Sequence, residues 1–189
     1  ISDREGTVPL RVIGSPTVKV RLTELCHLAF PGSLESILES VEWVEDAVGT
    51  TDDGWSWERF EVHHDDAVDP YGYRFENTDG VSFVHSGDSG PCEEIEKRTV
   101  NANVIILEMG MPDIGDFPYH YTPKGVKDLS ERNPDKMILV THNYASSKNN
   151  SEGFPIPDLP ENVHQLEDGD AIIFDENGAV TLLKKGEEK

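Results

Sequence analysis

Imidazole and carboxylate side chains follow the ends of several predicted strands. They are the pair His63 and His64, then Asp88, Glu108 and His142. Several such groups meeting at one edge of a sheet suggest a metal site, because neutral imidazoles and carboxylates are the ligands that Zn²⁺ takes. A carboxylate between two such ligands could also bridge a pair of metal ions. The pattern therefore favours a metal centre.

His120 lies in a long loop, just before the expected start of a helix. From there its imidazole could reach the same edge as a proton donor or as a stabiliser of negative charge. Simpler roles are open for the others: Asp88 could only turn the chain, and Glu108 could orient its loop from outside a metal site. His85 and His164 are interpreted as ordinary strand or surface residues.

The stretch at 81–94, VSFVHSGDSGPCEE, predicts the element that holds Asp88: a strand, a tight loop and the start of a helix. Further strands are expected at 8–13, 40–46, 57–62, 73–76, 103–107 and 136–140, with a hairpin formed by 170–174 and 179–183. Helices are expected at 17–30, 33–38, 92–98 and 122–133. Residues 49–54 are expected to form a loop, and 143–160 a mobile segment. This pattern indicates an α/β or α+β fold.

The composition limits the partners. The chain has 189 residues, enough for one domain spanning 1–189, and a formal charge of −21. That charge repels phosphate backbones, so a large nucleic acid is not expected as a partner. No stretch is apolar enough for a membrane span, and a cytoplasmic location is expected. Cys26 and Cys92 stand in no paired motif, and their redox state stays open.

The runs FEVHHDDAVDPYGYRFE, VSFVHSGDSGP, NVIILE, HYTPKGVKDL and MILVTHN, in this order, resemble the second half of a metallo-β-lactamase-fold hydrolase. The resemblance covers roughly residues 8–142. It is greatest to the branch that holds ribonuclease Z, the arylsulfatase-like proteins and small cyclic-nucleotide phosphodiesterases. It implies the αβ/βα sandwich of that family, of which this chain is the C-terminal portion.

The resemblance also implies roles for individual residues. His64 matches a metal ligand, with His63 as the alternative. Asp88 matches the aspartate that bridges two metal ions, and His142 matches a ligand of the second ion. His120 matches the histidine that holds the scissile phosphate or the leaving group. Two divalent ions, zinc or else manganese, are the implied cofactors.

Two departures from the family pattern narrow the function. The metal loop HxHxDH is absent, so we expect either that residues before Ile1 supply it or that the chain is a non-catalytic binding module. Only 23 residues separate His64 from Asp88, too few for the tRNA-gripping arm found in some ribonuclease Z enzymes. We therefore expect a metal-dependent hydrolase that cleaves a small phosphodiester, such as a cyclic nucleotide, through a metal-activated water. Alternatives are an arylsulfatase- or lactonase-type hydrolase and a tRNA 3′-processing nuclease; a homodimer is a further expectation.

Overall fold

A computed structural model describes residues 10–145, 153–175 and 178–186. The chain divides into two compact units, 1–47 and 48–189, each described here by itself. The single domain expected over 1–189 stays a prediction. Parts of three predicted elements lie outside the described residues: the start of the strand at 8–13, the middle of the segment 143–160 and the turn at 176–177.

The first unit holds a short parallel strand pair and two helices. Strand β1 (Arg11–Ile13) pairs with β2 (Glu42–Val44). Helix α1 (Pro16–Ala29) begins after Ser15, whose Oγ accepts a hydrogen bond from the N–H of Val18 at 3.4 Å. Pro16 at the first helical position needs no partner for an N–H, which favours a helix start there. Helix α2 (Glu35–Glu39) follows.

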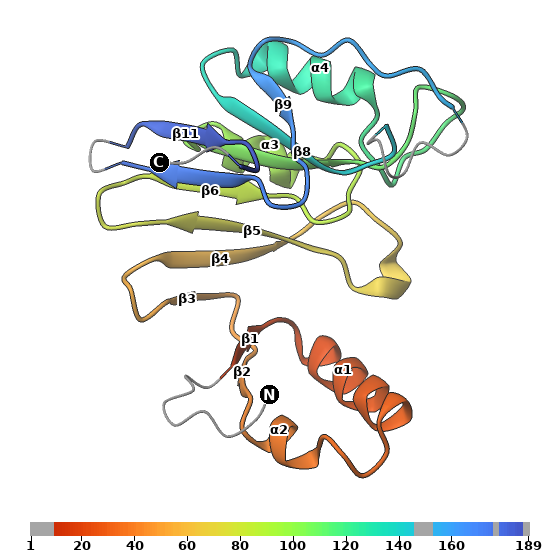
Figure 1. The fold of residues 1–189 in the computed structure, drawn as a ribbon, viewed down its shortest axis with the longest axis vertical. Helices are drawn as coiled ribbons and strands as arrows, with labels where there is room; N and C mark the ends of the chain where they lie inside the picture. Colours follow the sequence, from red (N-terminus) through yellow and green to blue (C-terminus); the bar gives the residue numbers. More distant parts are fainter. Residues whose placement is uncertain (1–9, 146–152, 176–177, 187–189) are drawn as a thin grey trace. The chain divides into compact units, whose positions relative to one another are not determined.

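The second unit is built on a seven-stranded sheet in which sequence order and spatial order agree (Figure 1). Its strands are β3 (Val48–Thr50), β4 (Ser56–Glu61), β5 (Tyr71–Glu76), β6 (Ser82–His85), β7 (Val104–Met109), β8 (Met137–Asn143) and β9 (Val163–Gln165). Strands β3 to β6 pair antiparallel, whereas β6 to β9 pair parallel. Because parallel strands end at the same edge, the loops after β6, β7 and β8 lie together.

Two helices cover one face of this sheet. They are α3 (Glu93–Thr99) and α4 (Pro123–Arg132), and a short 3₁₀ helix, η1 (Asp66–Val68), precedes β5. The core between helices and sheet is fully buried and includes Val84, Ile95, Ile105, Val126, Leu129 and Ile138. This apolar layer fixes the strands whose ends carry the polar groups.

The opposite face of the sheet carries aromatic side chains and a hairpin. Strands β10 (Ala171–Phe174) and β11 (Val180–Leu183) pair antiparallel, as predicted. Phe174 of this hairpin lies near Phe83 and Trp55, with ring centroids 6.2 and 5.8 Å away. Trp57 is buried and Trp55 is half-buried, so both tryptophans serve as packing residues.

Several strand limits differ from those expected, among them those of β3, β7 and β8. The loop predicted at 49–54 begins as strand β3, because Gly49 lets the backbone lie directly against the indole of Trp57. Strands β7 and β8 run past the expected ends at 107 and 140, since their hydrogen-bonded pairing continues to Met109 and Asn143. Strand β9 was not predicted. Glu108 and His142 therefore belong to strands and not to the loops that follow them.

Candidate metal centre

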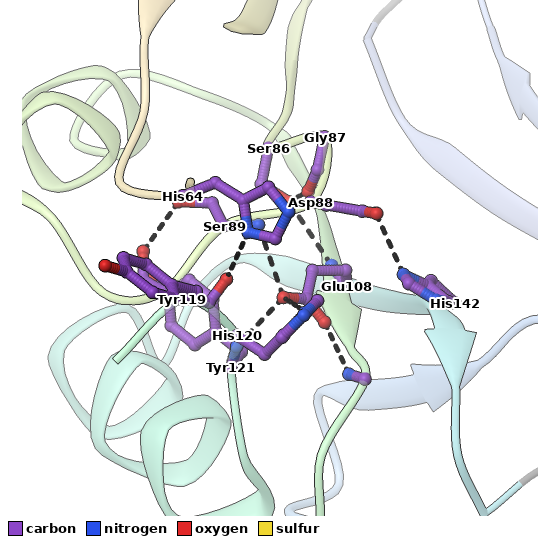
Figure 2. A network of polar contacts seen from close by, with 12 residues as sticks. His64, Ser86, Gly87, Asp88, Ser89, Glu108, Tyr119, His120, Tyr121 and His142 are labelled. Carbon is purple, nitrogen blue, oxygen red and sulfur yellow. Dashed lines mark hydrogen bonds and ion pairs between the residues drawn. The ribbon is translucent and has the colours of Figure 1, made fainter. Parts of the chain in front are cut away.

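The carboxyl edge of the parallel strands gathers five of the predicted residues into one polar network. Asp88 follows β6, Glu108 lies near the end of β7 and His142 near the end of β8. His64 comes from the loop after β4, and His120 from the loop before α4. Figure 2 shows these side chains facing a common region. The convergence expected from the sequence is thus present in the structure.

Each of the three imidazoles at this edge has its Nδ1 atom within hydrogen-bond distance of an oxygen atom (Figure 2). The pairs are His64 with the main-chain oxygen of Tyr119 (3.0 Å), His120 with Oε1 of Glu108 (2.8 Å) and His142 with Oδ1 of Asp88 (2.8 Å). A carbonyl oxygen only accepts, so Nδ1 of His64 must carry the proton. Its Nε2 then keeps a lone pair for a metal ion when the ring is neutral.

The imidazoles are also close to one another. The ring centroids of His64 and His120 lie 5.0 Å apart, and those of His120 and His142 lie 5.9 Å apart. Asp88 and His142 are about half exposed, at 51 and 52% of their side-chain surface. They can therefore be reached from solvent, as a metal ion and a substrate require.

Glu108 is different from the other acidic residue of the network because it is only 1% exposed. Its Oε1 accepts the N–H groups of Ser89 (3.2 Å) and Tyr121 (3.1 Å) in addition to His120, and its Oε2 accepts the N–H of Gly110. Burial raises the pKa of the Glu108 carboxyl, and the hydrogen bonds from Gly110, Tyr121 and His120 oppose that rise.

One ligand atom from each of Glu108, His120 and His142 lies within 4.8 Å of the others, a spacing that a metal ion could bridge. The carboxylate of Glu108 is already occupied by four N–H donors, however, so it is a poor candidate for a ligand. The imidazoles of His64 and His142 and the carboxylate of Asp88 are donors of the kind that a divalent ion takes, but among the described residues the ligand atoms that lie within 4.8 Å of one another are those of Glu108, His120 and His142. Glu108 instead fixes the orientation of His120.

His142 owes its position to an irregularity in β8. Thr141 pairs with Glu108 and Asn143 pairs with Met109, so His142 is an extra residue in the strand. Its backbone has a φ of 43°, in the left-handed region that side chains other than glycine rarely adopt. Such a bulge redirects the side chain of the inserted residue. Here it leaves His142 exposed and in contact with Asp88.

The loop that carries Asp88 is fastened to the neighbouring strand. Ser86 is fully buried, and its Oγ accepts the N–H of Glu108 at 3.2 Å. Gly87 adopts a φ of 62°, and its N–H donates to Nδ1 of His85 at 2.9 Å. Burial lowers the pKa of His85, although the carboxylate of Asp88 opposes this shift. His85 therefore serves the loop as a hydrogen-bond acceptor, a role not expected from the sequence.

Gly90 joins this loop to two others. Its N–H donates to the main-chain oxygen of His63 at 2.8 Å, and a Cβ atom on Gly90 would lie only 1.7 Å from the oxygen of Pro118. A glycine is thus needed for the loop bearing Tyr119 to come close enough to receive the His64 hydrogen bond. His63 is exposed, and its ring lies against that of Tyr119, with 5.5 Å between centroids.

Four contributors to the site were missed by sequence reasoning. They are Ser86, Ser89, Gly90 and Tyr119. Three of them belong to the SGDSGP motif, which was interpreted only as a turn around Asp88. Tyr119 acts through its main-chain oxygen, which leaves no signal in the sequence.

A family model described as a beta-lactamase superfamily domain matches residues 2–144. The search of curated proteins gave no match. Among the described residues, no helix is long and apolar enough to cross a membrane.

Similar structures have been solved. The long form of RNase Z from yeast is 14% identical, with a TM-score of 0.60, over 86% of this chain and 27% of that one. A diphosphatase of the PhnP family is 15% identical, with a TM-score of 0.56, over 93 and 59% of the two chains. The metallo-beta-lactamase fold protein YhfI from Bacillus subtilis is 15% identical, with a TM-score of 0.55, over 74 and 54%. These matches show the fold, and the chain spans roughly half the length of the last two proteins.

Proposed function

This chain belongs to the beta-lactamase superfamily and has the metallo-beta-lactamase fold, and from that premise we propose that it is a metal-dependent hydrolase of small phosphodiesters, such as cyclic nucleotides. The observation that carries the proposal is the set of three imidazoles whose Nδ1 atoms are all engaged by oxygen atoms. In metal sites, such hydrogen bonds hold each ring so that Nε2 points at the ion.

In this proposal His64, Asp88 and His142 would hold divalent metal ions. Zinc suits imidazole and carboxylate ligands best, and manganese is the alternative. When bound, such ions supply Lewis acidity that activates a water molecule and the phosphoryl group. We expect residues beyond these three to complete the ligand set.

His120 has a separate task. Its Nδ1 is held by the buried carboxylate of Glu108, so the ring cannot rotate away from the other two imidazoles, whose centroids lie 5.0 and 5.9 Å from its own. From this position it donates a proton to the oxygen of the leaving group or stabilises negative charge on the phosphoryl oxygens. His63 is left as an alternative ligand to His64.

Two observations support a small phosphodiester over a larger substrate. The chain carries a formal charge of −21, which disfavours a polynucleotide. The segment between β4 and Asp88 consists of η1, β5, β6 and short turns, with no added arm among its residues. One of the similar structures is a diphosphatase of the PhnP family, which is an enzyme whose substrate contains phosphate. A cytoplasmic location and a homodimer remain predictions.

The test combines metal analysis with an activity assay. We expect the purified protein to contain zinc or manganese and to hydrolyse bis-p-nitrophenyl phosphate. His142→Ala and Asp88→Asn should lose both metal and activity, whereas His120→Ala should keep its metal and lose about 10²–10⁴-fold in kcat. His27→Ala, which removes an exposed histidine of α1, is the matched control. Absence of both bound metal and diesterase activity would refute the proposal; activity on sulfate esters or lactones instead would replace the substrate class.

A further inference from the structure

A cavity of about 230 Å³ lies between the first two turns of α4, the loop after β7, Tyr144 and residues 154–158. Its walls are largely apolar, with several prolines and the side chains of Tyr144 and Phe154. These two rings meet edge to face, with centroids 6.0 Å apart and planes at 80°. Aromatic and proline side chains of this kind form the walls of sites in which a planar heterocycle binds.

Two wall residues of the cavity are close in sequence to histidines of the candidate metal centre. Tyr144 stands two residues after His142, and Pro123 stands three residues after His120. At about 3.6 Å per residue, these wall residues lie at most about 7 and 11 Å, between Cα atoms, from the two histidines. The N–H of Tyr144 also donates to the oxygen of Met109 at the end of β7, which fixes the wall to the sheet edge. A nucleotide is long enough to place its phosphate at one site and its base at the other.

Polar groups at the cavity rim select the chemistry of the occupant. Asp113 and Asp158 contribute carboxylates, and Lys127 contributes an ammonium group. One oxygen of Asp113 accepts the N–H of Lys124 at 3.0 Å, which leaves the second oxygen for a ligand. Two carboxylates repel a phosphate but accept N–H groups. The cavity thus favours a flat ring with N–H donors and keeps the charged end of a substrate outside.

We infer that this cavity binds the base of a nucleotide substrate, specifically a purine that carries an exocyclic amine, while the phosphodiester lies at the metal centre. The rings of Tyr144 and Phe154 contact the purine, and the carboxylates of Asp113 and Asp158 accept its amine. The inference rests on the proposed function, since it names the substrate of the same site. Within the phosphodiesters it selects adenine or guanine nucleotides over pyrimidine nucleotides.

Nucleosides test the base pocket without involving the phosphate. NMR titration of the full chain with adenosine should perturb the signals of Tyr144 and Phe154. Purine riboside, which lacks the amine, should bind at least about fivefold more weakly, because hydrogen bonds to a charged acceptor are lost. Phe154→Leu should weaken adenosine binding about tenfold through loss of ring contact. Phe117→Leu, in the same loop region but outside the cavity, should leave it unchanged.

The carboxylates are tested by charge removal. Asp113→Asn keeps an oxygen for the N–H of Lys124, so the helix start is preserved, yet it should reduce the preference for adenosine over purine riboside. Asp116→Asn, an exposed neighbour that does not line the cavity, should keep that preference. Equal binding of the two nucleosides, or signal changes elsewhere in the protein, would overturn the inference. If adenosine binds but no diester is hydrolysed, the proposed function fails and the base pocket stands. If diesters are hydrolysed but no nucleoside binds, the base pocket fails and the proposed function stands.

Discussion

Nδ1 of His120 lies 2.8 Å from Oε1 of Glu108, a carboxylate that is buried beneath the site and engaged by three main-chain N–H groups. These groups hold the carboxylate fixed, so the imidazole it contacts has one orientation. The pair joins β7 to the loop before α4 and places His120 between the other two imidazoles of the site.

Replacing Glu108 by glutamine should damage both stability and activity. The amide has only one acceptor oxygen for four N–H donors, and its own NH₂ would face some of them. We expect a loss of about 2–3 kcal/mol in the free energy of unfolding and of about 10–100-fold in kcat with metal content unchanged. Urea denaturation and diesterase kinetics measure these effects. Glu131→Gln on the exposed side of α4 is the control, and equal behaviour of the two variants would contradict this role of Glu108.

The backbone of His142 predicts an unusual order of stability. Its φ of 43° costs a residue with a Cβ about 1–2 kcal/mol, a cost that glycine avoids. We therefore expect His142→Gly to be more stable than His142→Ala by about 1 kcal/mol, although neither variant should bind metal normally. Urea midpoints and metal titration provide the measurements. Thr141 is the control, because it pairs in register with Glu108. Thr141→Gly should therefore be less stable than Thr141→Ala. The same order at both positions would show that the bulge is absent.

Gly90 leaves no room for a side chain. A methyl group there would lie 1.7 Å from the oxygen of Pro118, so the loop carrying Tyr119 and His120 would have to move. We expect Gly90→Ala to lose about 1–3 kcal/mol of stability and most of its activity, since the hydrogen bond from His64 to Tyr119 would be broken. Gly125→Ala is the control, because its new Cβ would meet side chains alone, the Tyr121 ring at 3.2 Å and Pro91 at 3.6 Å. Wild-type melting temperature and activity in Gly90→Ala would refute this packing argument.

Asp170 should make the stability of the β10–β11 hairpin depend on pH. The ammonium group of Lys184, at 2.8 Å, and the N–H groups of Glu167 and Lys185 lower the pKa of Asp170 to about 2. Because this pKa is depressed in the folded state, its contribution is present at neutral pH and is lost as the pH falls from about 4 towards 2. Asp170→Asn should thus be less stable than wild type at pH 7 and equal to it near pH 2. A difference that does not change with pH would exclude ionisation as its cause.

Much of the sheet, and the kinds of side chain that form the site, could be predicted from the sequence. The apolar runs at 103–107 and 136–140 predicted the two central parallel strands, because strands buried on both faces have no polar alternation. The polar residues after them predicted the carboxyl edge. The resemblance to metallo-β-lactamase-fold hydrolases is confirmed by the family match and by the similar structures.

The remaining features depend on main-chain geometry, which side-chain patterns do not report. The sequence Thr141-His142-Asn143 contains no glycine to mark a bulge, so the extra residue in β8 could not be predicted. The oxygen of Tyr119 binds His64 as the oxygen of any residue there could. The short distance between Gly90 and Pro118 depends on two loops that are far apart in sequence. The division of roles between His120 and Glu108 follows from burial, which only the three-dimensional structure provides.

The sequence separations within the network have a consequence for how the protein folds. The contact between His64 and Tyr119 spans 55 residues, and that between Asp88 and His142 spans 54. The first contact closes a loop that contains β5, β6 and β7, and the second closes a loop that contains β7 and most of β8, and each contact costs the entropy of closing its loop. A metal ion would therefore find its ligands assembled only in the final stage of refolding. From then on its binding would stabilise the folded state by an amount that grows with the logarithm of its affinity for the completed edge.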